Sequence, residues 1–217
     1  MTVFDEISTI LLDMDGTILD KYFDDYFWEI FLPERYAEKE GLSFSEAQKI
    51  LFNMYKAEEG TLNWTDIDFW SLKTGIDIFT LKKQLTHLIK PHPDAEDFLN
   101  FISSNGKKVY LATNAHNKVM NLKLEKTGFA RYFHKTFTSF DIGYPKERLE
   151  FWHKLKECID FEPEKTVFVD DTEEILHRAK SFGIKMPILR GLSSSRSEPR
   201  KSNHFLTINS FKEIIKI

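Results

Sequence analysis

The sequence has very little cysteine and no long apolar run. Cys158 is the only cysteine, so the chain can form no internal disulfide and no zinc site built from several cysteines. A single cysteine of this kind is most often a small apolar core residue, and we expect Cys158 to be buried. No window approaches the roughly 18 apolar residues that a membrane-spanning helix needs. The sequence therefore predicts a protein with no membrane partner.

Net charge is also low, and the start of the chain has no leader pattern. The 30 basic and 34 acidic residues give a formal charge of -4, so there is no electrostatic reason to expect binding to nucleic acid. Residues 1–10 contain neither a basic segment nor a long apolar stretch, both of which secretory leaders need. We therefore expect a cytoplasmic protein, in which a small anionic substrate would need a local positive site.

What the sequence does contain is a globular composition with an excess of aromatic rings. Hydrophobic residues make up 41% and charged residues 29% of the 217 residues, a length that suits one domain with a large insertion or two small domains. Of the 31 aromatic residues, 14 lie between residues 22 and 90. Most of these rings should form a local core, and any that face a cleft could stack on a planar base.

Short apolar segments alternate with helical patterns over most of the chain. Four segments have the pattern of buried strands that end in polar residues: 7–12, 108–111, 166–169 and 186–189. Helical periodicity is found at residues 94–105, 118–126, 146–159 and 173–182. This order predicts an α/β fold with a mostly parallel sheet and helices on both faces. Ligands of such sheets bind at the carboxyl ends of the strands.

The stretch from residue 22 to 90 breaks this alternation, because it has several helical patterns and no convincing strand. One pattern runs up to Pro33, where we expect the helix to end. A second follows the capping box formed by Ser43 and Glu46, and a third covers residues 78–88. The sequence therefore predicts a helical insertion after the first strand.

The ends of this insertion suggest a division into two domains. Pro91-His92-Pro93 is a plausible hinge back to the sheet. We therefore predict a core domain of residues 1–20 and 91–217, and a second domain of residues 21–90. Within the core, the Ser- and Arg-rich residues 191–203 have the composition of a mobile surface loop.

Two aspartates follow the first strand at a spacing of two. In Asp13-Met14-Asp15-Gly16-Thr17 both carboxylates of an extended segment can project to the same side. Gly16 permits a tight turn with exposed N–H groups, which suits a phosphate oxygen. Two close carboxylates repel each other, and a site that keeps both usually holds a cation or shares a proton. An ordinary Asp-rich turn is the structural alternative.

Asp170 and Asp171 follow another apolar strand. If that strand lies next to the first, four carboxylates meet at one point, and such a cluster is costly without a cation. Hard oxygen ligands in this number favour Mg²⁺, which we predict as the cofactor. Taken without Asp13 and Asp15, the pair would equally suit the N-terminus of a helix.

Three more polar residues stand where a phosphate would be bound. Thr113 and Asn114 end a third strand, where a hydroxyl and an amide can donate to a phosphoryl oxygen, although a turn or a helix cap accounts for them nearly as well. Lys146 stands at the expected start of a helix, a poor place for a cation unless it faces an anion. A solvated surface lysine is the alternative. These residues and Gly16 are the predicted phosphate-binding groups.

Together these residues resemble the motifs of the haloacid dehalogenase (HAD) superfamily of phosphotransferases. The matching segments follow in the family's order: Asp13-Met14-Asp15-Gly16-Thr17, Leu111-Ala112-Thr113-Asn114, Lys146 and Val169-Asp170-Asp171. The resemblance implies a Rossmann-like core with an α-helical cap of the C1 type after the first strand, which fits residues 21–90. Asp15 points to the phosphatase and mutase branches, because true dehalogenases lack this second aspartate.

The resemblance also implies roles for these residues. Asp13 would attack phosphorus and form an aspartyl-phosphate, and Asp15 would protonate the leaving oxygen and then activate water. Mg²⁺ would be held by the backbone carbonyl of Asp15 and by three carboxylates: Asp13, Asp170 and Asp171. The predicted phosphate-binding residues would complete the clamp on the substrate.

Longer strings resemble the bacterial GMP/IMP nucleotidases of this superfamily: Phe23-Asp24-Asp25-Tyr26-Phe27-Trp28, Thr61-Leu62-Asn63-Trp64, Thr113-Asn114-Ala115-His116 and Gly143-Tyr144-Pro145-Lys146. The resemblance implies a phosphatase of purine 5'-mononucleotides, with flavin mononucleotide (FMN) as a further candidate substrate. His116 could orient a phosphate or cap the following helix, and we expect the cap. The expected partner is a small phosphomonoester, and the expected assembly is a monomer or small homo-oligomer.

Two other functions fit the same residues. The substrate could be phosphoglycolate or a sugar phosphate, or the protein could be a phosphomutase of the same superfamily. A protein of another class, a binding protein that keeps the fold without turnover, is the third alternative. The intact pair of Asp13 and Asp15 argues against it, because binding alone has no chemical need for both carboxylates.

Overall fold

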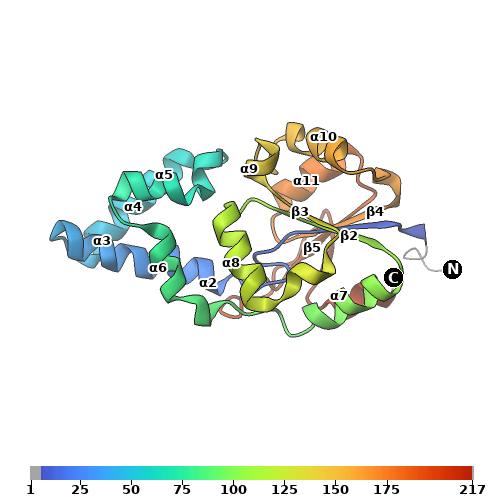
Figure 1. Cartoon of the computed structure of the whole chain (residues 1–217), viewed down its shortest axis with the longest axis horizontal. Helices are drawn as coiled ribbons and strands as arrows, with labels where there is room; N and C mark the ends of the chain where they lie inside the picture. The colour runs from blue at the N-terminus through green and yellow to red at the C-terminus, as the bar shows by residue number, and fades with distance from the viewer. Residues whose placement is uncertain (1–5, 217) are drawn as a thin grey trace.

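The computed structural model describes residues 6–216 and contains one six-stranded parallel sheet (Figure 1). The strand order is β3-β2-β1-β4-β5-β6, and every neighbouring pair is parallel. The strands are β1 Thr9–Leu12, β2 Lys108–Thr113, β3 Lys135–Thr138, β4 Thr166–Asp170, β5 Met186–Arg190 and β6 Leu206–Ile208. The predicted α/β fold is therefore confirmed, with β1 at the centre between β2 and β4.

Helices cover both faces of the sheet, and successive strand residues pack alternately against the two helical layers. Ile10 and Leu12 pack in one core with α7 and α8, whereas Leu11 packs in a second core with α10 and α11. The bounds are α7 Ala95–Ser104, α8 Asn117–Thr127, α9 Ser139–Ile142, α10 Leu149–Cys158 and α11 Glu173–Phe182, with the short helices η4 Phe129–Tyr132, η5 Pro163–Lys165 and η6 Phe211–Lys216.

Three local predictions for this core were wrong. The strands β3 and β6 were missed, because both are short and lack an apolar run. The helix expected from residue 146 begins at Leu149, after a turn in which the Arg148 N–H donates to the carbonyl of Pro145. Cys158 is exposed at the end of α10, where the next residue, Ile159, is buried instead.

In the described part of the chain, the segment between β1 and α7 contains helices and no strand of the sheet, and Figure 1 shows these helices grouped to one side of it. They are α2 Tyr22–Tyr26, η1 Phe27–Phe31, α3 Leu32–Glu40, α4 Phe44–Glu58, η2 Leu62–Thr65, α5 Ile67–Thr74, α6 Ile78–Gln84 and η3 Thr86–Leu88. The capping box of Ser43 and Glu46 is confirmed. Trp28, Tyr55 and Trp70 form the aromatic centre of the insertion, with ring centroids 5.0–6.2 Å apart.

The helix expected to stop at Pro33 continues to Glu40. It passes through a π-helical turn, η1, in which the Leu32 N–H bonds to the carbonyl of Phe27, five residues back. Pro33 then occupies the first turn of α3, where its missing N–H costs little. The proline therefore marks a change of hydrogen-bonding pattern and not the end of the helix.

The two connections between the sheet and the insertion lie side by side. Leu19 and Pro91 form an antiparallel bridge, the Asp20 N–H donates to the Lys90 carbonyl (2.9 Å), and the His92 N–H donates to the Ile18 carbonyl (3.0 Å). On this basis we propose to keep the predicted division at residues 20/21 and 90/91, which the pairing of the two connections supports.

Two further predictions concern a leader segment at the start of the chain and a membrane-spanning helix. Residues 1–5, on which the expected lack of a leader partly rests, lie outside the described residues. Within residues 6–216, none of the helices combines the length and apolarity needed to span a bilayer.

Candidate active site

The predicted carboxylates meet at the carboxyl ends of two neighbouring strands. β1 pairs directly with β4, with Leu12 beside Val169, so the residues that follow each strand come together. Asp13, Asp170 and Asp171 are each at most 7% exposed, and one oxygen from each lies within 4.8 Å of the others. The predicted convergence therefore holds for these three carboxylates, whereas the Asp15 side chain makes its ion pair elsewhere.

Lys146 lies inside this group and is 1% exposed. Its Nζ is 2.5 Å from Asp13 Oδ1 and 2.7 Å from Asp170 Oδ2. The turn before α10 is fixed by Trp152, whose Nε1 donates to the Lys146 carbonyl (3.0 Å). The alternative of a solvated surface lysine is therefore wrong. We call Asp13, Asp170, Asp171 and Lys146 the catalytic cluster.

The catalytic cluster carries more negative than positive charge. Burial raises the pKa of Asp13, Asp170 and Asp171 to about 6, although Lys146 lowers all three. Burial alone would lower the pKa of Lys146, but Asp13 and Asp170 outweigh it and hold that pKa above its ordinary value. Among the described residues, Asp13 Oδ2 is buried with no hydrogen-bond partner. These features fit a divalent cation, which would satisfy that oxygen and offset the excess charge.

Gly16 has a structural task that differs from the predicted one. Its N–H donates to the Leu19 carbonyl (2.7 Å) and so is already used. Its φ is +85°, and a Cβ at this position would lie 2.5 Å from Asp171 Oδ2. Gly16 is therefore needed for the close approach of Asp171 to the end of β1, and the exposed N–H that we expected there is not present.

Thr113 and Asn114 end β2 beside the catalytic cluster, but their side chains have different surroundings. Thr113 is buried and accepts a hydrogen bond from the Ala115 N–H (3.1 Å). Asn114 accepts from the Lys146 N–H through Oδ1 (2.9 Å) and donates through Nδ2 to both Glu147 oxygens (3.0 Å each). The Asn114 amide thus holds the Lys146 turn in place, whereas the sequence led us to expect that it donates to phosphate.

Asp15 is bound by a set of buried charges that the sequence patterns did not reveal. Lys123 Nζ, from α8, lies 2.6 Å from Asp15 Oδ1 and 2.5 Å from Asp24 Oδ2, in α2. Lys82 Nζ, from α6, lies 2.8 Å from Asp24 Oδ1. We call Asp15, Lys123, Asp24 and Lys82 the buried ion chain. Its signal in the sequence is weak: Lys123 follows the apolar Val119 and Met120 on one face of α8.

The buried ion chain changes the proton affinity of its members. Burial raises the pKa of Asp15 to about 6, although Lys123 opposes this. Burial also favours protonation of Asp24, but the two ammonium groups outweigh it and hold its pKa well below the usual range. Burial lowers the pKa of Lys82, whereas Asp15 and Asp24 keep that of Lys123 above its ordinary value. The buried ion chain therefore alternates carboxylate and ammonium groups, each within 2.8 Å of the next.

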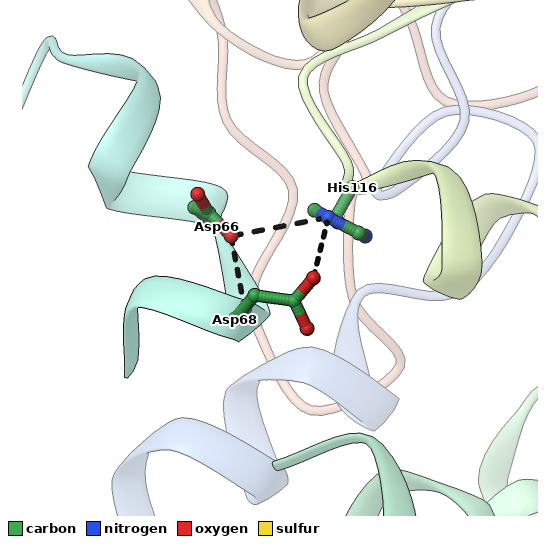
Figure 2. Close-up of side chains that lie close together, drawn as sticks. All are labelled: Asp66, Asp68 and His116. Carbon is green, nitrogen blue, oxygen red and sulfur yellow. Dashed lines mark hydrogen bonds and ion pairs between the residues drawn. The ribbon is translucent and has the colours of Figure 1, made fainter. Parts of the chain in front are cut away.

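His116 caps α8, as expected, and also faces the insertion (Figure 2). Its Nδ1 accepts from the Lys118 N–H (3.2 Å), and its Nε2 lies 3.8 Å from Asp66 and 3.7 Å from Asp68. Lys118 Nζ is 2.7 Å from Asp68. This contact and the ion chain both join the insertion to α8.

Arg200 is a second site contact that the sequence did not reveal. Its Nη2 donates to the Asp171 carbonyl (2.6 Å) and lies 3.6 Å from Asp171 Oδ2. The surface-loop prediction holds for residues 195–201, which are exposed, but Ser193 and Ser194 are buried. The loop therefore forms one side of the candidate site.

One cavity of about 590 Å³ connects the catalytic cluster with the insertion. The insertion lines it with four rings, which we call the aromatic wall: Trp28, Phe52, Tyr55 and Trp64. Phe52 is 42% and Trp64 41% exposed, so both rings have faces available to a ligand. Thr113 and His116 line the same cavity from the β2 side.

Comparison with known proteins agrees with this architecture. The haloacid dehalogenase-like hydrolase family matches residues 7–183. The GMP/IMP nucleotidase YrfG of Escherichia coli is 37% identical over 180 residues, which are 83% of this chain and 81% of that protein. The glyceraldehyde 3-phosphate phosphatase of Methanocaldococcus jannaschii is 27% identical over 97% of this chain and 96% of its own.

A solved structure shows the same fold over nearly the whole chain. The crystal structure of a HAD phosphatase from Thermococcus onnurineus superposes with a TM-score of 0.82 and 25% identity, and the match covers 97% of each chain. The sequence match, the parallel sheet and the carboxylates at the ends of β1 and β4 all point the same way. The chain belongs to the haloacid dehalogenase-like hydrolase family and is a phosphatase of that family.

Proposed function

We propose that this protein is a Mg²⁺-dependent phosphatase that acts on purine 5'-mononucleotides through an aspartyl-phosphate. The observation that carries the proposal is the single cavity that joins the catalytic cluster to the aromatic wall. A phosphate at one end and a planar base at the other would occupy both parts of it. The 37% identity to a GMP/IMP nucleotidase supports GMP and IMP as substrates, with FMN as a further candidate.

The first chemical step assigns a role to each aspartate after β1. Lys146 contacts Asp13 Oδ1 and so orients the carboxylate that attacks phosphorus. As the bond from Asp13 to phosphorus forms, the bond from phosphorus to the ester oxygen breaks, and Asp15 gives that oxygen a proton. In the second step Asp15 takes a proton from water, whose oxygen attacks phosphorus and releases phosphate from Asp13.

The remaining residues would bind the phosphate and the metal. Lys146 provides a positive charge beside Asp13, and Thr113 provides a hydroxyl donor in the same cavity. Asp13, Asp170, Asp171 and the Asp15 carbonyl would hold Mg²⁺, which when bound supplies positive charge to the phosphoryl oxygens. A cytoplasmic location and a monomer or small homo-oligomer stay predictions.

Removing a carboxylate of the cluster should stabilise the metal-free protein. Asp171 is nearly buried and its folded pKa of about 6 exceeds the ordinary 3.8, so the folded protein holds its proton more tightly than the unfolded chain. The ionised form therefore costs stability at pH 7.5, and the cost shrinks as the pH falls from 6 towards 4. Asp171→Asn in EDTA should raise the free energy of unfolding by on the order of 1 to 3 kcal/mol.

The same variant should lose its response to metal. Mg²⁺ at about 100 times its Kd should stabilise the wild type by about 3 kcal/mol. Thermal unfolding in EDTA and in Mg²⁺ measures both effects, with Asp97→Asn, an exposed aspartate of α7, as the matched control. An Asp171→Asn protein with an undiminished Mg²⁺ shift would contradict the proposed metal site.

Removing one ring of the aromatic wall should separate nucleotides from smaller substrates. Trp64→Ala should lower kcat/KM for GMP by about 5- to 150-fold, because stacking a base on an aromatic ring contributes about 1–3 kcal/mol. Phosphoglycolate and glyceraldehyde 3-phosphate lack a base, so their kcat/KM should change little. Leu72→Ala, on the exposed surface of α5, is the control. Wild-type turnover of glyceraldehyde 3-phosphate above that of GMP would favour the sugar-phosphate alternative.

A further inference from the structure

The buried ion chain runs from the end of β1 into the helical insertion. Its four members come from four different elements: the loop after β1, α8, α2 and α6. Lys123 lies between Asp15 and Asp24 in this chain, and its Nζ contacts Asp15 Oδ1 and Asp24 Oδ2 at the same time. One ammonium group therefore joins a proposed catalytic carboxylate to the insertion.

The surroundings of these charges are largely apolar. Lys123 and Lys82 are each 1% exposed. Lys82 Nζ lies 4.2 Å from the Phe27 ring centroid, and both ammonium groups lie near the Phe23 ring, at 4.9 and 5.1 Å. Buried ion pairs are costly to desolvate, and apolar residues of similar size often give equal or greater stability. Stability alone therefore does not account for this chain of charges.

We propose that Lys123 is a positioning residue that holds the Asp15 carboxylate in place through its simultaneous contact with Asp24. The proposal rests on the proposed function, because it assumes that Asp15 delivers the proton to the leaving oxygen. With Oδ1 held by Lys123, Oδ2 is left for that transfer. Since Asp24 belongs to α2 and is held by Lys82 of α6, Asp15 is correctly placed only while the insertion is docked on the sheet.

A test should isolate proton delivery from binding and folding. Phenyl phosphate and 4-nitrophenyl phosphate are nearly the same size, but the nitrophenolate leaves readily without a proton and the phenolate does not. The kcat/KM values report the steps up to the first bond cleavage, and so exclude the later attack of water. The ratio of the two kcat/KM values therefore measures how much the enzyme relies on Asp15 as an acid.

Lys123→Met removes the charge and keeps the length of the side chain. We expect kcat/KM to fall on the order of 100-fold for phenyl phosphate, which is within the range of general acid catalysis. For 4-nitrophenyl phosphate we expect kcat/KM to fall by less than about tenfold, because its leaving group needs no proton. Asp15→Asn should show the same pattern, and Lys123→Arg should recover part of the loss. Lys126→Met, one turn along α8 with a side chain outside the cavity, is the matched control.

Asp24→Asn keeps the test decisive if Lys123→Met does not fold, because it leaves Lys123 paired with Asp15 and removes only the negative charge that Lys123 and Lys82 share. We expect about a tenfold loss on phenyl phosphate and little on 4-nitrophenyl phosphate. Equal losses on both substrates, or no loss, in folded variants would overturn the proposal and leave the proposed function intact. Failure of the wild type to hydrolyse either ester in Mg²⁺ would instead overturn the proposed function, and the role of Lys123 with it.

Discussion

Replacing Asp13 with Asn should abolish turnover while the protein still folds. The amide cannot attack phosphorus, so kcat for GMP should fall at least about 10³-fold, as expected when a covalent nucleophile is removed. Asn is nearly the same size as Asp, and Lys146 keeps its contact with Asp170 (2.7 Å). The loss of one negative charge also relieves repulsion with Asp171. Thermal unfolding of the variant should therefore remain cooperative.

Two measurements check this prediction. Release of inorganic phosphate from GMP gives the loss of turnover, and intact-protein mass spectrometry after rapid acid quenching detects the aspartyl-phosphate. The adduct should form in the wild type and be absent from Asp13→Asn. Asp97→Asn, far from the cluster on α7, should keep both activity and adduct. An adduct that persists in Asp13→Asn would show that another residue is the nucleophile.

Replacing Lys146 with Met should reduce both activity and stability strongly. The ammonium group is the closest cation to Asp13 and Asp170, and removing it leaves two buried carboxylates without their ion-pair partner. Breaking such a pair typically costs 3–5 kcal/mol, so we expect a loss of about 3 kcal/mol in EDTA at pH 7.5. The loss of charge beside the phosphate should lower kcat/KM for GMP by on the order of 100-fold or more.

A double variant separates the two effects. Lys146→Met with Asp170→Asn removes one charge of each sign, and should recover part of the unfolding free energy without recovering activity. Urea denaturation in EDTA gives the stability, and phosphate release in Mg²⁺ gives the activity. Lys154→Met, on the exposed side of α10, is the control. If Lys146→Met left both quantities unchanged, the buried ion pairs described for it would have to be wrong.

Local sequence patterns predict the parts of the site that adjacent residues define. A buried strand followed by Asp-x-Asp-Gly needs only one segment of chain, and the ends of parallel strands must meet at one edge of the sheet. These patterns therefore indicate that Asp13, Asp170 and Asp171 come together, as they do in the fold. The short strands β3 and β6 escape prediction because their positions are set by pairing with longer strands and by little in their own sequences.

Contacts between distant segments cannot be predicted in this way. Lys123 is 108 residues from Asp15, and nothing in its own helix says which carboxylate it will meet. Arg200 lies in a segment whose composition suggests only a loop, beyond the region that matches the family. The sequence indicates that Asn114 belongs to the site but not what it binds. Its amide is hydrogen-bonded to Glu147 and to the Lys146 N–H, which come from another loop. These residues need three-dimensional pairing to be recognised.

The paired connections at Leu19 and Pro91 restrict how the insertion can move. Because the two adjacent backbone segments are hydrogen-bonded to each other, we expect the insertion to rotate about one hinge axis more easily than it twists or slides. The aromatic wall and Asp24 both belong to the insertion, so we expect them to move together. On our proposals, contact of the base with the aromatic wall and placement of the Asp15 acid then both depend on the position of the insertion.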